Sequence, residues 1–477
     1  MAKKMQQRAK SAKMGRSGVN RVLLSIPLIA LIFKLIIILR IPAIAWPNVD
    51  PNLYRLDKFW MGADGENYVT GLTGLFQEGL FSEVERLTYF PAGYPILIYA
   101  LTFFSQAWSL LIIALLQTLL YTGASIYFVH QLTKTRLAKF AWLIALILAF
   151  NPTLAFNSYA IGYESLVASL LLISFGLLMQ DYRKSKSKLV SREVLLVALL
   201  LGITSFVQPR MVATAFIIFS IWALATRAKL VALGLIVISM LITLFFPASL
   251  YIRNVVARDV PAVSTNLGTT IFIGVGPEAT GGYNGKYNGV PCPEAVGTEA
   301  EVDSAKVRCA IKWYLENPGP ALELAAKKAV FYWSPWFGPV ANGTMARNPW
   351  NQNHPLKSTA QNQQGYDLIF GTIGKVVSWL WLLSTIGFML FGFWILWRAN
   401  GLERLLGVTA LAVIIINMLV SMATIGDHRF RLPVAGLSLF LQGVGLAWAF
   451  SKRVRRSING EEKLLWKSLT RTTNLPV

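Results

Sequence analysis

The chain has few charged residues. Only 14% of its 477 residues are Asp, Glu, Lys or Arg, whereas 55% are hydrophobic and the mean hydropathy is +0.51. Ordinary soluble domains contain about 25% charged and roughly 45–50% apolar residues. A soluble fold could not bury this much apolar surface. The composition therefore excludes an ordinary soluble enzyme and indicates that a bilayer surrounds the protein.

Acidic residues are the scarcer charged type. The chain has 23 Asp and Glu against 45 Lys and Arg, and its formal net charge is +22. Such a charge can indicate nucleic-acid binding, but here the cations lie in short clusters between apolar runs, and no nucleic-acid-binding motif accompanies them. We therefore exclude nucleic acid as a partner. The clusters are typical of cytoplasmic loops in multi-pass membrane proteins, so membrane lipids are expected partners.

Histidine is also rare. The three histidines, His130, His354 and His428, are scattered and form no metal-binding motif. The Gly274–Gly276 run lacks the strand–helix context of a dinucleotide fingerprint, and the chain has no GK[ST] phosphate loop. These absences argue against a nucleotide-sugar donor. The sequence assigns no cofactor and leaves a divalent metal ion as an open alternative.

Long apolar runs are what the sequence does contain. About ten runs have the length and composition of membrane helices. They cover residues 22–43, 107–130, 137–152, 158–180, 193–208, 210–226, 229–248, 370–397, 404–424 and 432–451. A shorter apolar stretch at 92–105 contains Pro95 and reads as an interfacial or re-entrant segment. The predicted fold class is an all-α polytopic membrane protein.

The positions of the Lys and Arg residues predict the orientation. Residues 1–21 carry seven Lys or Arg and no acid, and the tail at 452–477 is also basic. By the positive-inside rule, we expect both termini to be cytoplasmic. We expect a multi-pass protein of the plasma membrane. A transmembrane domain would cover 22–451. Two long loops, 44–106 and 249–369, would then be external.

Both cysteines, Cys292 and Cys309, fall in the second of these loops. An external loop lies in an oxidising compartment, where disulfides form and persist. We therefore predict a disulfide between the two cysteines, with two free thiols as the alternative.

The first external loop carries the most informative motif. Asp64, Glu66 and Tyr68 precede apolar residues at helical spacing, and Gly79 would end that helix. The pattern predicts an amphipathic helix at the membrane interface. Asp64 could simply cap this helix while Glu66 complements its dipole. The alternative is that one of the two carboxylates takes part in chemistry.

Five motifs together resemble the signatures of the GT-C superfamily of membrane glycosyltransferases, in particular its bacterial protein-mannosyltransferase-like branch. In chain order they are Asp64 to Tyr68 with Tyr89-Phe90-Pro91-Ala92-Gly93-Tyr94-Pro95, Asn151-Pro152 before Tyr159 and Glu164, Gln208-Pro209-Arg210, Tyr251-Ile252-Arg253-Asn254, and Arg429-Phe430-Arg431-Leu432-Pro433. The resemblance covers about residues 22–450. It implies a GT-C-like fold of ten to thirteen membrane helices and transfer of a sugar from a polyprenyl phosphate.

Such a transfer needs a base for the acceptor hydroxyl and cations for the leaving phosphate. Asp64 or Glu66 is the candidate catalytic base, and the choice stays open because Gly65 splits the adjacent Asp-Glu pair of the family. The candidate substrate-binding residues are Tyr68, Lys34, Glu164, Arg210, Arg253, His428, Arg429 and Arg431. The arginines at helix ends could instead contact lipid headgroups.

Lys34 falls inside the first predicted helix, where a cation is a sign of function. It could contact substrate, extend its amine to the membrane surface, or pair with an acid such as Glu164.

The predicted function is transfer of a hexose or pentose from a polyprenyl-phosphate donor to a glycan, lipid or protein acceptor at the outer face of the membrane. The main alternative is a transporter or flippase of a lipid-linked or anionic substrate. A sugar polymerase or ligase of related fold is a third possibility. Transporters commonly show repeated halves, and no repeat is evident in this sequence.

Overall fold

The structure is a computed structural model of the 477-residue chain. The residues that it describes are 23, 25–36, 50, 52–55, 60–61, 64–151, 154, 158–184, 191–282, 290, 296–333 and 372–450. Within these ranges, the side chains of Trp60, Met61, His428 and most residues of 372–382 lie outside the description.

Helices make up nearly all of the described structure. A helical segment at Ser25–Ile36 comes first. The later elements are β1 (Trp60–Met61), α2 (Gly65–Glu78), α3 (Arg86–Tyr89), α4 (Gly93–Thr102), α5 (Gln106–Leu132), η2 (Arg136–Phe140), α6 (Ala141–Phe150), β2 (Ala160–Ile161), α8 (Glu164–Arg183), α9 (Arg192–Val207), α10 (Met211–Thr226), α11 (Lys229–Arg258), α12 (Leu267–Ile273), α13 (Glu299–Glu316), α14 (Pro318–Trp333), α18 (Thr372–Trp397), α19 (Leu402–Ala423), η4 (His428–Val434) and α20 (Ala435–Phe450).

The all-α membrane fold is confirmed, apart from the short parallel pair β1–β2. Five described helices are long and apolar enough to cross a membrane: Gln106–Leu132, Glu164–Arg183, Lys229–Arg258, Leu402–Ala423 and Arg429–Phe450. Shorter apolar helices are Ser25–Ile36, Gly93–Thr102, Met211–Thr226 and Leu383–Trp397. The count of about ten spans stays a prediction, because some predicted runs form pieces of about 15 Å, half a bilayer.

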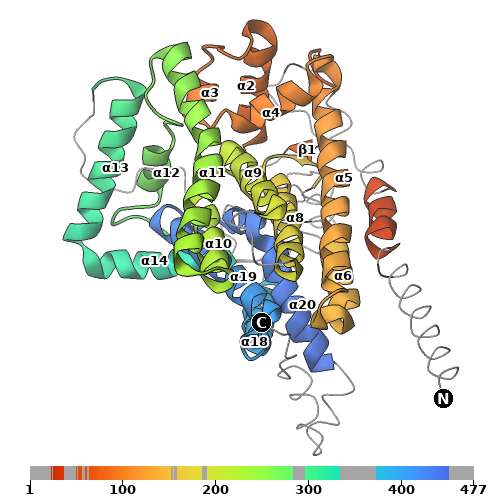
Figure 1. The fold of residues 1–477 in the computed structure, drawn as a ribbon. Coiled ribbons are helices and arrows are strands. Elements are labelled where there is room, and N and C mark those ends of the chain that lie inside the picture. Colours follow the sequence, from red (N-terminus) through yellow and green to blue (C-terminus); the bar gives the residue numbers. More distant parts are fainter. Residues whose placement is uncertain are drawn as a thin grey trace, which may run out of the picture.

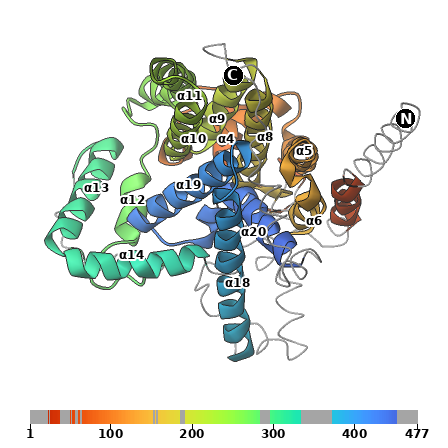
Figure 2. The same cartoon turned by 60° about the horizontal axis from the view of Figure 1, so that its bottom comes forward.

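The helices form one bundle with two groups attached to it. In Figure 1, α5, α8, α9, α10 and α11 run side by side, and α2, α3 and α4 gather at one end of them. Helices α12, α13 and α14 lie together beside α11. Figure 2 shows α19 between α14 and the bundle, with α18 and α20 next to each other. The chain segments on both sides of the region 334–371 therefore meet at α19.

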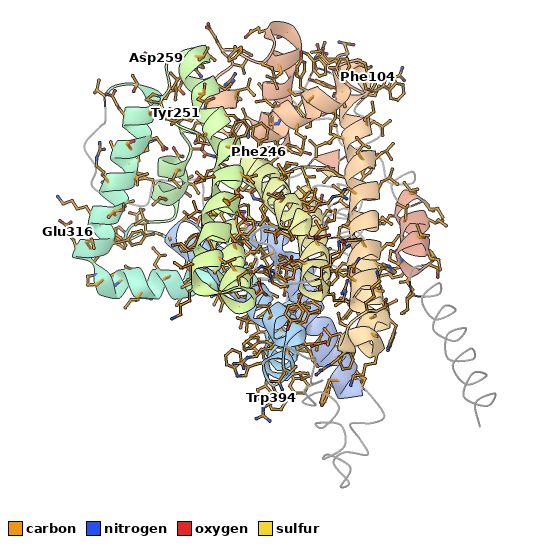
Figure 3. All side chains as sticks on the ribbon, in the orientation of Figure 1. Phe104, Phe246, Tyr251, Asp259, Glu316 and Trp394 are labelled. Atoms are coloured by element: carbon orange, nitrogen blue, oxygen red, sulfur yellow. The ribbon has the colours of Figure 1, made fainter. Side chains whose placement is uncertain are left out.

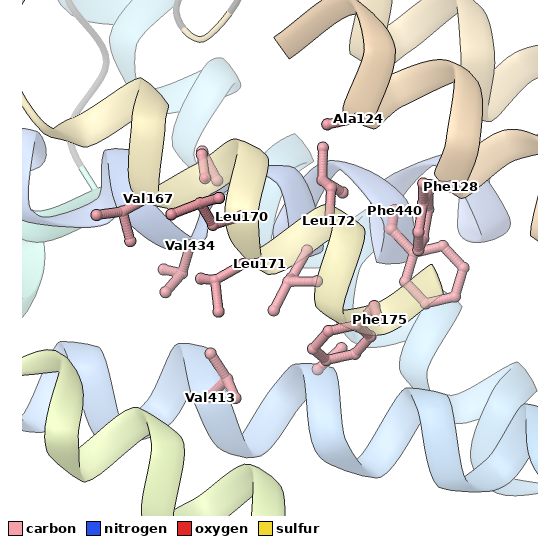
Figure 4. Close-up of a cluster of buried hydrophobic side chains, with 14 of the residues drawn as sticks. Ala124, Phe128, Val167, Leu170, Leu171, Leu172, Phe175, Val413, Val434 and Phe440 are labelled. Atoms are coloured by element: carbon pink, nitrogen blue, oxygen red, sulfur yellow. The ribbon is translucent and has the colours of Figure 1, made fainter. Parts of the chain in front are cut away.

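Helix α8 lies at the centre of the bundle, and α11 lies at its edge. In their most apolar stretches, 78% of the residues of α8 are buried but only 28% of those of α11. Apolar residues of α8 pack in one buried cluster with residues of α5, α19 and α20. Figure 4 shows part of this cluster, with Phe175 on α8, Phe128 on α5, Val413 on α19 and Phe440 on α20. A helix that is hydrophobic all round is typical of a protein core. The exposed apolar residues of α11 suit a surface that faces lipid.

Large apolar side chains also project from other parts of the surface. Phe104, between α4 and α5, is 65% exposed, and Trp394 on α18 is 38% exposed (Figure 3). A bilayer would cover such side chains.

The predicted first-loop helix is confirmed as α2, which begins after Asp64 and ends at Gly79, where φ is 84°. Its apolar stripe is Tyr68, Leu72 and Leu75, and all three are at most 4% exposed. These side chains contact protein, including α4, so this stripe does not lie on lipid as we had expected.

Helix α11 is longer than predicted. The predicted 229–248 segment continues to Arg258, and Asp259 ends it with a left-handed φ of 55°. Pro247 lies inside this helix. A proline removes one hydrogen bond of a helix interior, but membrane helices tolerate it. The Tyr251 to Asn254 motif therefore sits on the last turns of α11.

The predicted disulfide is described at one end only. Cys309, on α13, is disulfide-bonded. Cys292 lies outside the described residues, so its pairing with Cys309 stays a prediction.

Gly93 allows α4 to touch the end of α9. A Cβ atom built at Gly93 would lie 1.9 Å from the carbonyl oxygen of Phe206. Real Cβ atoms do not approach an oxygen so closely, so any side chain at this position would push the two helices apart. This contact explains why the proline-glycine motif needs a glycine here.

We expect Gly93→Ala to lower the stability of the protein by about 1–3 kcal/mol, the usual cost of overpacking. The matched control is Gly123→Ala on α5, where nothing lies within 4 Å of the added methyl group. Thermal unfolding in detergent compares the two variants. Equal melting temperatures would show that α4 and α9 are not in contact.

Candidate active site

Asp64 stands at the N-cap of α2 but does not cap it. Its carboxylate makes no capping hydrogen bond with the described helix. Instead its Oδ2 accepts a hydrogen bond of 2.8 Å from Nη1 of Arg429, which lies 365 positions later in the chain. Only 17% of the Asp64 side chain and 13% of the Arg429 side chain are exposed. The carboxylate is therefore part of a long-range ion pair, and the capping alternative is not observed.

Arg429 lies between two carboxylates. Its Nε is 3.9 Å from Oε1 of Glu164, the first residue of α8, whose side chain is 6% exposed. Its backbone N–H donates to Oδ1 of Asp427 at 2.9 Å, which sets the start of η4. Three of the sequence motifs thus meet at one guanidinium.

Glu66 occupies the first turn of α2 and is partly exposed. Positions two apart in a helix do not face each other. Glu66 therefore lies on a different face of the helix from Asp64. The described ion pairs of Arg429 are with Asp64 and Glu164. This geometry favours Asp64 as the base.

Tyr68 is the centre of a buried aromatic group beside these acids. Its ring centroid lies 5.2 Å from that of Tyr94, 6.1 Å from that of Phe90 and 6.3 Å from that of Tyr163. Burial, followed by the negative charge of Asp64, holds the pKa of the Tyr68 hydroxyl well above its ordinary value. The hydroxyl therefore stays protonated and can donate a hydrogen bond to a ligand.

A backbone contact brings the segments before Asp64 and Glu164 together. The strands β1 and β2, which precede these acids, pair in parallel. The segment before Glu164 is also held by α4, because the Tyr94 hydroxyl accepts a hydrogen bond of 3.0 Å from the N–H of Gly162. The first-loop acid and the α8 acid are thus positioned by the same local structure.

Arg210 is a cation with unused donors. Its guanidinium lies 4.2 Å from the centroid of the Phe430 ring, and its Nη2 donates a long hydrogen bond of 3.3 Å to the Tyr163 hydroxyl. Its buried Nε has no hydrogen-bond partner within the described structure. No carboxylate of the described ranges forms an ion pair with it. These properties suit an arginine that binds an anionic ligand.

Arg431 faces a different direction from Arg429. It is 7% exposed, and its guanidinium lies 5.4 Å from the ring centroid of Trp333 at the end of α14. Residues two apart in a 3-10 helix do not share a face, since eclipsing occurs at a spacing of three. The side chain of His428 lies outside the described residues, so its predicted role stays a prediction.

Lys34 is not brought to Glu164. It is 3% exposed, and its Nζ lies 4.9 Å from the ring centroid of Tyr121 on α5. Glu164, which we had considered as its partner, pairs with Arg429 instead. The pairing was wrong because the sequence does not show which helix covers the start of α8.

Arg253 binds the backbone of the protein itself. Its guanidinium donates to the carbonyl oxygens of Leu80 at 3.1 Å and Leu87 at 3.4 Å, and also to that of Ser82. These carbonyls belong to the segment from α2 to α3. None of its described contacts is with Asp64, Glu164 or Arg429, so the structure does not place Arg253 with the predicted phosphate-binding residues.

We therefore expect Arg253→Met to destabilise the protein without changing the KM for the lipid donor. The substitution leaves three backbone carbonyls without a charged donor, and each hydrogen bond to a charged group contributes about 1.5–3 kcal/mol. Thermal unfolding and donor kinetics measure the two effects separately. A raised donor KM at unchanged stability would return Arg253 to the substrate site.

Sequence reasoning missed several residues of this cluster. Gln208 and Phe430 belong to the named motifs and Tyr163 directly precedes Glu164, but we assigned none of them a role. Gln208 Nε2 donates to the Tyr163 hydroxyl at 2.7 Å, and the Phe430 ring lies 4.2 Å from the Arg210 guanidinium. The usable signal was their position in or next to the motifs. Among the described residues, no group of three or more His, Cys, Asp or Glu could hold a metal ion.

Comparison with known proteins gave matches among solved structures only. No protein-family model matches the chain, and no curated protein matches it.

The solved structures include the oligosaccharyltransferase of Archaeoglobus fulgidus in complex with Zn and sulfate, at 14% identity and a TM-score of 0.48, over 93% of this chain and 51% of that chain. AglB from Archaeoglobus fulgidus, in complex with an inhibitory peptide and a dolichol-phosphate, matches at 13% identity and a TM-score of 0.45, over 92% of this chain and 52% of that chain. ArnT from Cupriavidus metallidurans in the apo state matches at 13% identity and a TM-score of 0.46, over 94% of this chain and 62% of that chain. The chain spans about half the length of the oligosaccharyltransferases.

Proposed function

We propose that this chain is a membrane glycosyltransferase that transfers a sugar from a polyprenyl-phosphate-linked donor to an acceptor hydroxyl. The observation that carries the proposal is the contact of one arginine, Arg429, with both Asp64 and Glu164, three side chains that are at most 17% exposed. It provides a carboxylate that can accept a proton and an arginine that holds this carboxylate in place, next to the motif residue Arg210, whose guanidinium can stabilise a phosphate. The acceptor is a glycan, a lipid or a protein.

In the proposed reaction Asp64 accepts the proton of the acceptor hydroxyl. The acceptor oxygen bonds to the anomeric carbon as the bond from that carbon to the phosphate oxygen breaks. The electron pair of the broken bond leaves with the lipid phosphate. Attack from the side opposite to the leaving group inverts the configuration, as the family resemblance implies.

Each cation has its own part in this scheme. Arg429 holds Asp64 in position through the 2.8 Å contact, and so acts as a positioning residue. Arg210 offers the buried Nε to the leaving phosphate, and a planar guanidinium is well suited to phosphate. Arg431 is the second candidate for the phosphate, because its charge, like that of Arg210, acts on Tyr332.

We also propose that the site lies at the outer end of the bundle. Glu164 begins α8 and Arg210 precedes α10, whereas Arg183 ends α8 and Arg227 follows α10. The site residues Glu164 and Arg210 thus lie at the opposite ends of these two helices from the basic loops. With the basic ends cytoplasmic, as the positive-inside rule expects, the site opens outward and both termini face the cytoplasm.

The proposal is tested by incubating the purified protein with a panel of polyprenyl-phosphate hexoses and pentoses and with hydroxyl acceptors. Mass spectrometry measures sugar release and the new glycoside. We expect release with one donor class by the wild type and none by Asp64→Asn. Movement of an intact lipid-linked sugar across vesicles, without cleavage by any donor, would support the transporter alternative instead.

A further inference from the structure

The turn that leads to Arg429 is held by the helices of the second external loop. Thr424 to Gly426 connect α19 to η4, and the N–H of Gly426 donates to the carbonyl oxygen of Gly281 at 2.9 Å. A Cβ atom at Gly426 would lie 2.6 Å from Cα of Lys328. A Cβ atom at Gly274 would lie 2.0 Å from the carbonyl oxygen of Thr424. Backbone contacts on two sides therefore fix this turn.

Lys328 is the charged residue in this contact. It lies on the buried stripe of α14 between Leu324 and Tyr332, at spacings of four, and is fully buried. Lysine is almost never fully buried unless it is paired. Within the described residues no carboxylate forms an ion pair with it. A leucine or methionine would fill the same space without burying an amine, so the position calls for a specific explanation.

The amine of Lys328 bonds to the turn itself. Its Nζ donates to the carbonyl oxygen of Thr424 at 2.7 Å and to the hydroxyl of Tyr314 at 2.8 Å. That hydroxyl donates in turn to the carbonyl oxygen of Ala423 at 3.2 Å. The side chains of α13 and α14 thus hold the last carbonyls of α19, which a helix end leaves without partners. Burial lowers the pKa of Lys328 to about 7.

We propose that Lys328 is a positioning residue for sugar transfer, which holds the turn at Thr424 and thereby the guanidinium of Arg429. This inference rests on the proposed function. The connection between the two residues is short: Asp427 follows the turn directly and accepts the backbone N–H of Arg429. A shift of the turn therefore moves η4 and the side chain that holds Asp64. A misplacement of about 1 Å can lower a rate by about 10²-fold.

The first test compares Lys328→Met with Lys327→Met. Lys327 is the neighbouring lysine on the same helix, but it is half-exposed and pairs with Glu323 on the surface. We expect Lys328→Met to lower kcat by about 10- to 100-fold while the KM for the donor stays within about threefold. Hydrogen exchange should accelerate in residues 424–434. Lys327→Met should match the wild type in all three measurements.

Two further variants separate positioning from simple filling of space. Lys328→Arg keeps hydrogen-bond donors and should recover most of kcat, whereas a purely space-filling role predicts no recovery beyond that of methionine. Tyr314→Phe keeps the ring but removes the hydroxyl between Lys328 and Ala423. Tyr314→Phe should also lower kcat and accelerate hydrogen exchange in residues 424–434, but less than Lys328→Met does. If Lys328→Met does not fold, Tyr314→Phe tests the positioning role in its place.

Unchanged exchange in residues 424–434 for Lys328→Met, or for Tyr314→Phe where the former does not fold, would overturn the inference. A fall in kcat without faster local exchange would do the same, because Lys328 would then act elsewhere. A wild type that releases no sugar from any donor refutes the proposed function and with it the catalytic role of Lys328. Hydrogen exchange would then still show whether the lysine holds the turn.

Discussion

Asp64→Asn should abolish sugar transfer and leave the protein folded in the membrane. Asparagine has nearly the same shape, and its amide oxygen can still accept the hydrogen bond from Arg429. No cap is lost, because the aspartate makes no capping bond with α2. An amide cannot take the acceptor's proton, and general base catalysis contributes typically about 10²–10⁴-fold. Turnover at saturating donor measures the loss, and monodisperse elution in detergent verifies folding.

Glu66→Gln is the paired control for this experiment. Its carboxylate stands in the first turn of α2, two residues from Asp64. We expect near-normal turnover from this variant. If Glu66→Gln is inactive and Asp64→Asn is active, Glu66 is the base. Normal turnover by both variants would make the first-loop acids structural and would remove the main support for a glycosyltransferase.

Arg429→Gln should cause the second large loss, in stability as well as in turnover. The guanidinium lies between Asp64 and Glu164, so its removal leaves two enclosed carboxylates without a counter-charge. Breaking a buried ion pair by removing one partner costs up to about 3–5 kcal/mol. Turnover should fall at least about 10²-fold, because Asp64 loses its orientation. Thermal unfolding and donor turnover, measured on the same preparation, report the two losses.

The double variant Arg429→Gln with Asp64→Asn tests the physical reason for that loss of stability. It removes one of the two stranded charges, so it should unfold at a higher temperature than Arg429→Gln alone. Asp64→Asn alone should stay close to the wild type. If the double variant is less stable than either single variant, the contact is not an ion pair in solution.

The local features of the fold could be predicted from the sequence. Apolar runs of sufficient length predicted a membrane protein, because each backbone polar group in lipid must be satisfied within a helix. Gly79 marked the end of α2, because glycine accommodates the positive φ that the chain adopts there. Asp64 stands directly before the first residue of the helix but makes no capping hydrogen bond with it. The same reasoning missed the true end of α11 at Arg258, because Pro247 stands inside that helix.

The residues of the candidate site were also named from the sequence, through motifs that resemble a family. Asp64, Glu164, Arg210 and Arg429 all lie in the cluster that the structure describes. Arg253 was grouped with them because arginine at a helix end suits a phosphate. In the structure, the Arg253 guanidinium instead donates hydrogen bonds to three backbone carbonyl oxygens between α2 and the start of α3. An arginine at a helix end can therefore bind the protein's own backbone as well as a phosphate.

The sequence by itself determined the class of the protein, its main apolar helices and the residue types available for chemistry, because these depend on composition and on neighbours along the chain. Only the tertiary structure decided the partners. Asp64 meets Arg429 across 365 positions, Glu164 pairs with that arginine and not with Lys34, and Lys328 reaches Thr424. Such contacts depend on which helix faces pack together, and helix packing is set by side-chain shape along whole faces, which no local pattern contains.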